Sequence, residues 1–88
     1  MKIKDGYKLR RVCGSAIVVA VGKAVADLNG LVTLNETGEY LWSILENGSE
    51  PEALARALSE EYSIDEAQAK KDVVDFISQL KGAGLVEE

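Results

Sequence analysis

The hydrophobic pattern of this chain changes its period at Asn35. Residues 31–34 have the apolar, extended character of a β-strand, whereas Leu41 and Leu45 begin a pattern with the spacing of one helix face. Asparagine is a preferred helix N-cap, so Asn35 can end the strand and start the helix at once. The sequence therefore predicts a β-rich part before Asn35 and a helical part after it.

Three strands are predicted in the first part, over residues 7–13, 16–22 and 30–34. The Gly14–Ser15 pair between the first two suits a two-residue hairpin turn, which places Cys13 opposite Ala16. The second strand is apolar on both faces, and this favours a central position in the sheet. The third strand then becomes the edge of a three-stranded antiparallel sheet.

Three helices are predicted in the second part, over residues 36–47, 50–62 and 66–81. Ser49 is the expected N-cap of the second helix, with Pro51 in its first turn. Asp65 is the expected N-cap of the third helix, and Gln68 can return the bond to the cap. Glycines after the third helix leave an extended tail at residues 85–86 that can pack on the core. Three short helices, joined by turns of only a few residues and preceded by a small sheet, indicate an α+β fold of winged helix-turn-helix type.

Length and composition fit one compact domain over residues 1–88. The chain has 88 residues, of which 47% are hydrophobic and 28% charged, and its net charge is −5. A chain of this kind has room for one modest core and little space for a deep enclosed cavity. The negative charge disfavours non-specific binding to nucleic acid or to an anionic membrane. No apolar run approaches the roughly 20 residues of a membrane span, and we expect a cytoplasmic protein.

Side chains suited to catalysis or metal binding are few in this sequence. The chain has one cysteine, Cys13, and no histidine, which excludes an internal disulfide and an ordinary zinc site of Cys/His type. The carboxylate pairs Glu60–Glu61 and Asp72–Asp75 have helical spacing and are expected to be solvated surface charge. No histidine is present to activate Cys13 as a nucleophile. We therefore expect no catalytic residue, no metal and no cofactor.

Several short motifs follow one another along the second part of the chain. The third strand leads into "LNETG" at residues 34–38, and Trp42 lies in the helix after it. The second helix ends in "EEY" at residues 60–62, and the third carries D-V-x-x-F-x-x-x-L at residues 72–80, followed by Gly84 and Leu85. This ordered set resembles the family of pyrroloquinoline quinone biosynthesis protein D (PqqD). The resemblance extends over nearly the whole chain, from about Tyr7 to Val86.

The resemblance implies a RiPP recognition element, the kind of domain that recruits the leader of a ribosomally made and later modified peptide. It implies a three-stranded sheet with three helices, in which the leader adds as a further strand on the third strand and lies against the third helix. The domain then presents the leader to a modifying enzyme, which for PqqD is a radical S-adenosylmethionine enzyme. The recognition element itself catalyses nothing.

The residues of the third strand favour a docking edge on their own account. An edge strand exposes unpaired N–H and C=O groups, which proteins usually block with charge, proline or a bulge. The segment "GLVTL" has none of these devices apart from being short. Addition of a peptide strand is therefore predicted, with the alternative that the tail at residues 85–86 or a dimer partner covers the edge. The predicted contact residues are Gly30, Leu31, Val32, Thr33 and Leu34.

The third helix offers a second predicted contact. The helical spacing predicts a core stripe of Ala69, Val73, Phe76, Ile77 and Leu80. Val74 lies away from this stripe, beside Lys70 and Lys81 and next to Ile77. An apolar residue between two lysines suits an amphipathic leader whose acidic side chains pair with the lysines. The alternative is an ordinary exposed valine. The helix part of the predicted peptide site is thus Lys70, Val74, Ile77 and Lys81.

Two other functions fit the predicted fold. A winged helix-turn-helix domain can bind DNA through its third helix, but the lysines there alternate with acidic residues and the net charge repels phosphate. The edge strand can instead pair with its symmetry mate in a structural or dimerising domain. The sequence leaves open whether the protein is a monomer or a homodimer, and which peptide and which modifying enzyme it serves.

Overall fold

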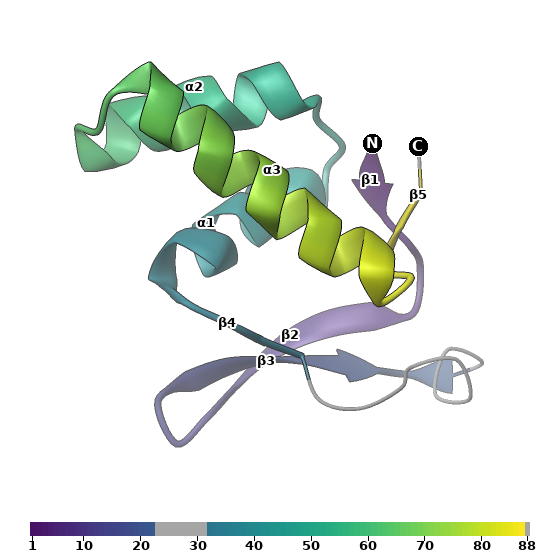
Figure 1. The fold of residues 1–88 in the computed structure, drawn as a ribbon. Helices are drawn as coiled ribbons and strands as arrows, with labels where there is room; N and C mark the ends of the chain where they lie inside the picture. Colours follow the sequence, from purple (N-terminus) through teal and green to yellow (C-terminus); the bar gives the residue numbers. More distant parts are fainter. Residues whose placement is uncertain (23–31, 88) are drawn as a thin grey trace.

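The computed structural model describes residues 1–22 and 32–87 (Figure 1). Its elements are, in order, β1 (Lys2–Ile3), β2 (Tyr7–Val12), β3 (Ser15–Ala20), β4 (Val32–Leu34), α1 (Glu36–Leu45), α2 (Pro51–Tyr62), α3 (Glu66–Gly82) and β5 (Val86–Glu87). Figure 1 shows the three helices gathered on one side of the sheet of β2, β3 and β4. The predicted α+β class, a three-stranded antiparallel sheet followed by three helices, is confirmed. None of these described helices is long and apolar enough to cross a membrane.

β3 is the central strand of the sheet, as its two apolar faces predict. The strand order is β2-β3-β4, and both pairings are antiparallel. Ala16 and Val18 are buried in the core, while Ile17 on the opposite face is half-buried. Among the described residues β4 pairs with β3 alone, so its other edge carries no strand. Gly30 and Leu31, the predicted start of this strand, lie outside the described residues.

The hairpin between β2 and β3 turns one residue earlier than predicted. Cys13 and Gly14 form the turn with φ values of 52° and 82°, and Val12 pairs with Ser15. A type I′ turn needs positive φ at both central residues, and glycine suits the second of them. The predicted Gly14–Ser15 turn is therefore wrong, as is the pairing of Cys13 with Ala16. Both registers keep the same side chains on the core face, so the hydrophobic alternation does not distinguish them.

The predicted caps of α1 and α3 are present. Asn35 Oδ1 accepts a hydrogen bond from Gly38 N at 2.8 Å. Asp65 Oδ1 likewise accepts one from Gln68 N at 2.8 Å. Each bond satisfies a backbone donor that the first turn of a helix leaves without a partner. The Gln68 side chain bonds away from the cap, because its amide donates to Asp72 Oδ1 at 2.9 Å.

The predicted N-cap of α2, Ser49, is wrong. The helix begins at Pro51, and its cap residue is Glu50, with extended backbone angles of φ −107° and ψ 155° and no side-chain bond to the first turn. A Ser49 cap requires Glu50 to be the first helical residue, but a residue that precedes proline is disfavoured in the helical conformation. Ser49 N instead donates to Met1 O at 2.9 Å, which ties β1 to the start of α2.

The first and last described strands pair with each other. β1 and β5 form a separate two-stranded antiparallel sheet, in which Ile3 lies opposite Val86. Lys4 N donates to Leu85 O at 2.9 Å, and Leu85 is fully buried, so the predicted packing of the tail on the core is confirmed. The sequence does not predict β1, because two residues have no periodicity of their own. Since the tail pairs with β1, the alternative in which it covers the edge of β4 is wrong.

One core lies between the helices and the inner face of the sheet. Trp42, Leu45 and Leu58 are fully buried in it, from α1 and α2. The predicted core stripe of α3 is buried throughout and consists of Ala69, Val73, Phe76, Ile77 and Leu80. The helical periodicity therefore predicts correctly which face of α3 is internal.

Replacement of Leu58 with alanine should lower the free energy of unfolding by about 2–5 kcal/mol, because a fully buried side chain leaves a cavity. Glu60→Ala is the matched control, since Glu60 is exposed on the same helix and its removal should cost less than about 0.5 kcal/mol. Urea unfolding followed by circular dichroism measures both. Similar losses for the two variants would contradict the assigned core.

Candidate functional site

The hairpin register determines which backbone groups of β4 face outward. Residues that flank a two-residue turn form a hydrogen-bonded pair, here Val12 and Ser15, and bonded pairs then alternate along the ladder. Ile17 consequently directs its N–H and C=O toward β2. Thr33, the residue opposite Ile17, therefore has its own N–H and C=O directed away from β3. These are the groups to which an added strand would bond.

A contact from α3 agrees with this direction. Gln79 Nε2 donates to Thr33 O at 3.4 Å, so the carbonyl group of Thr33 faces α3. The bond is long and exposed, and bonds of this length are weak. A peptide N–H that approaches the edge of β4 can replace the Gln79 amide as the donor to Thr33.

A groove lies between the edge of β4, the start of α1 and one side of α3. Its volume is about 480 Å³. The strand and corner side of the groove is formed by Thr33, Leu34, Asn35, Thr37, Gly38 and Leu41. The α3 side is formed by Asp72, Asp75, Phe76 and Gln79, which we call the α3 wall. The groove brings an open strand edge next to a helix.

The corner between β4 and α1 is tightly packed around Gly38. Asn35 Oδ1 accepts bonds from Gly38 N at 2.8 Å and from Thr37 Oγ1 at 3.0 Å. A Cβ atom on Gly38 would lie 3.1 Å from Asn35 Oδ1 and 3.4 Å from Leu34 Cβ. Glycine therefore lets the end of the strand and its cap lie directly on the first turn of the helix.

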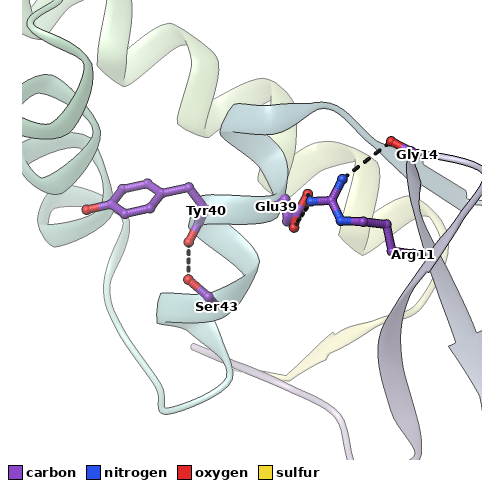
Figure 2. A network of polar contacts seen from close by, with 5 residues as sticks. All are labelled: Arg11, Gly14, Glu39, Tyr40 and Ser43. Carbon is purple, nitrogen blue, oxygen red and sulfur yellow. Dashed lines mark hydrogen bonds and ion pairs between the residues drawn. The ribbon is translucent and has the colours of Figure 1, made fainter.

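An ion pair holds the same corner from the sheet side. Figure 2 shows the Arg11 guanidinium directed at the Glu39 carboxylate, with a second bond from Arg11 Nη1 to Gly14 O at 3.4 Å. This contact joins the inner face of β2 to the first turn of α1, where an acidic residue also interacts favourably with the helix dipole. Tyr40 points away from the ion pair in Figure 2, and Ser43 Oγ donates to Tyr40 O at 2.6 Å.

The ring of Tyr40 lies beside the ion pair in one shallow depression, which Arg11, Glu39 and Tyr62 also line. It lies edge-on against Tyr62 of α2, with a distance of 5.7 Å between the ring centroids. Burial and, to a lesser extent, the nearby Glu36 carboxylate raise the pKa of Tyr62 above its ordinary value. The Tyr62 hydroxyl therefore remains neutral at pH 7 and adds no charge beside the acidic start of α1.

The helix residues predicted as peptide contacts lie elsewhere on α3. Lys70 and Val74 line a second groove, between α2 and α3, and Val74 is 59% exposed. Ile77 is 7% exposed and belongs to the core. Lys81 is exposed in the last turn of the helix. At about 100° per residue, these lysines and Val74 lie on one flank of the core stripe, and the α3 wall lies on the other.

The structure thus brings the predicted strand residues together with a different set of helix residues. Val32 and Leu34 point their side chains into the core and leave the edge of β4 facing the α3 wall. The sequence does not predict Phe76 and Gln79 as groove residues, and it predicts Asp72 and Asp75 as solvated charge. No signal in the sequence identifies them, because both flanks of the core stripe are polar and only helix packing decides which one meets the strand.

The described residues that line the groove include no histidine and no cysteine. Cys13 is exposed in the hairpin turn, outside the groove. Within residues 1–22 and 32–87, no three His, Cys, Asp or Glu side chains are grouped to hold a metal ion. The chemistry that the groove offers is hydrogen bonding from a strand edge, with two carboxylates and an aromatic ring beside it.

Comparison with known proteins identifies a family and two similar structures. The sequence model of the family described as "Coenzyme PQQ synthesis protein D (PqqD)" matches residues 17–86. The structure of TbiB1 in complex with the TbiA(beta) leader peptide is similar with a TM-score of 0.76 and 28% identity, over 99% of this chain and 95% of that chain. Lasso peptide synthetase B1, complexed with the leader peptide, has a TM-score of 0.74 and 18% identity, over 99% and 96% of the two chains. No curated protein matches the sequence.

Replacement of Asn35 with alanine should lower the free energy of unfolding by about 1 kcal/mol, because Gly38 N loses its cap. Asn35→Asp keeps an acceptor oxygen at the N-terminus of α1. Its free energy of unfolding should therefore remain close to that of the unsubstituted protein. Urea unfolding followed by circular dichroism compares the two variants. Equal destabilisation by both would show that the side-chain oxygen does not cap the helix.

Proposed function

The chain belongs to the PqqD family, and on this basis we propose that it binds the leader of a ribosomally made precursor peptide as an added strand on β4. The observation that carries the proposal is the open edge of β4, whose Thr33 backbone groups face a groove of about 480 Å³. Main-chain hydrogen bonds supply affinity in this mode of recognition, and side-chain pockets beside the strand supply specificity.

Two features of the fold support a docking role for this edge. The tail at residues 85–86, the alternative cover for β4, pairs with β1 instead, so the described chain leaves the edge open. The edge also has a neighbour in α3, and a peptide between the two would bury more surface than one on an isolated edge. The similar structure of TbiB1 was solved with a leader peptide, and that of lasso peptide synthetase B1 likewise.

The proposed contact residues combine the predicted strand with the α3 wall. From the strand they are Gly30, Leu31, Val32, Thr33 and Leu34, of which the first two lie outside the described residues. From the helix they are Asp72, Asp75, Phe76 and Gln79. These replace Lys70, Val74, Ile77 and Lys81, because Lys70 and Val74 face the second groove and Ile77 is buried.

The proposed role is recognition without catalysis. The absence of histidine leaves the single cysteine without the usual general base, and the groove offers hydrogen bonds and charge. The chemistry would belong to a separate peptide-modifying enzyme to which this chain presents the leader. Family membership favours a radical S-adenosylmethionine enzyme, and the similarity to lasso peptide synthetase B1 adds enzymes of lasso peptide synthesis as a second class. A cytoplasmic location belongs to the same proposal, because precursor peptides are made by ribosomes there.

Titration of the ¹⁵N-labelled protein with the precursor peptide encoded beside its gene tests this role. The amide signals of Thr33 and of the α3 wall should shift, because the peptide lies between them. The signals of Lys70 and Val74 should shift less, since these residues face the other groove. Absence of any shift at saturating peptide, or shifts confined to α2, would contradict the proposal.

A substitution at Thr33 separates strand addition from other modes of binding. Thr33→Pro removes the outward N–H and should weaken peptide binding about tenfold, because a peptide carbonyl loses its donor. Proline is tolerated at an edge position whose N–H faces outward, so the fold should persist, and circular dichroism checks this. Thr33→Val keeps the N–H and is the matched control. Isothermal titration should give Thr33→Val a peptide affinity close to that of the unsubstituted protein. Equal affinities for all three proteins would exclude strand addition at Thr33.

A further inference from the structure

Among the described residues that line the β4 groove, the two charged side chains are both acidic. Asp72 and Asp75 are the charged members of its lining, and they lie one turn apart on α3, separated by about 4.5 Å along the helix axis. Asp72 is half-buried and Asp75 is exposed. The groove therefore presents two carboxylates on the wall opposite the open strand edge.

Within residues 1–22 and 32–87, neither carboxylate forms an ion pair. Asp72 Oδ1 accepts a bond from the neutral amide of Gln68 at 2.9 Å. In the part of the chain that the structure describes, Lys71 makes no ion pair with either aspartate, and Arg11 is engaged by Glu39. Lys70 lies on the opposite flank of α3, in the second groove. The described residues therefore provide no cationic partner for the α3 wall.

The pleat of the sheet determines which peptide side chains would meet this wall. Val32 and Leu34 point toward the helices and Thr33 points to the outer face, so an added strand in the same sheet alternates in the same way. Every second peptide side chain therefore faces α3, and such side chains are about 6.8 Å apart. One or two of them would lie beside Asp72 and Asp75.

We propose, building on the proposed function, that this groove selects leader segments with a lysine or arginine on the side that faces α3, through Asp72 and Asp75. A cationic side chain there pairs with carboxylates that no cation among the described residues engages, whereas an acidic one is repelled by both. The inference reverses the sequence-based expectation of an acidic leader, which depends on Lys70 and Lys81. The two aspartates act as specificity residues, and the backbone of Thr33 contributes affinity for any extended peptide.

Selection from a displayed library of random twelve-residue peptides tests the inference. The library is selected in parallel on the unsubstituted protein, on Asp72→Asn/Asp75→Asn, and on Glu66→Gln. The double variant keeps the shape and the acceptor oxygens of the wall but removes its charge. Glu66→Gln removes one carboxylate from the same helix on the flank that faces the second groove, and is the matched control.

Peptides selected on the unsubstituted protein and on Glu66→Gln should be enriched in lysine and arginine at alternate positions, and those selected on the double variant should not be. For one selected peptide, each single substitution, Asp72→Asn or Asp75→Asn, should weaken binding about two- to fivefold in low salt, and added salt should reduce the difference. The same peptide with serine in place of its lysine should bind the unsubstituted protein and the double variant equally.

The outcomes separate this inference from the proposed function. Enriched peptides without a preference for cations, or with the same preference on the double variant, would overturn the specificity and leave strand addition intact. Failure to enrich any peptide on the unsubstituted protein would overturn the proposed function and the inference with it.

Discussion

The register of the β2–β3 hairpin sets the direction of every backbone hydrogen bond in the sheet. The turn at Cys13–Gly14 makes Val12 and Ser15 a bonded pair, and the alternation from this pair leaves the N–H and C=O of Thr33 facing outward. The predicted register, with Cys13 opposite Ala16, would keep the same side chains buried. It would, however, move β3 along β2 relative to the observed position. The positive φ of the two turn residues therefore helps to decide where a peptide strand can bond.

The corner at Asn35 turns the open edge into one side of a groove. Asn35 caps α1 while Gly38 allows Leu34 to lie against the first turn, so the chain leaves the sheet and enters the helical layer without a loop. The ion pair of Arg11 and Glu39 joins the hairpin to the same turn (Figure 2). Exposed ion pairs contribute little to stability, so this contact mainly orients the corner while the buried core supplies the free energy.

In the proposed recognition, the backbone of β4 and the side chains of the α3 wall have different roles. The edge of β4 can form backbone hydrogen bonds with any extended peptide, and these bonds by themselves give no selectivity. The α3 wall adds an aromatic ring at Phe76 and the charge of Asp72 and Asp75. In the proposed complex, the peptide would lie between the sheet edge and the α3 wall, and this mode of binding needs no enclosed cavity.

Much of the fold follows from local patterns in the sequence. The two apolar faces of β3 predict its central position, the helical period predicts the buried stripe of α3, and Asn35 and Asp65 mark the starts of their helices. The cap of α2 is wrongly predicted at Ser49, because the conformational restriction before Pro51 outweighs the preference of serine for a cap position.

By itself, then, the sequence determined the class of fold, the inner faces of its helices and the strand whose edge is open, since each depends on the spacing of neighbouring residues. Only the tertiary structure decided that the tail pairs with β1 and that β4 faces Asp72, Asp75, Phe76 and Gln79 instead of Lys70 and Val74. Both flanks of the α3 stripe are polar and therefore look alike in sequence. The flank that meets the strand is chosen by the packing of α3 on the core, which brings together residues about 40 positions apart in the chain.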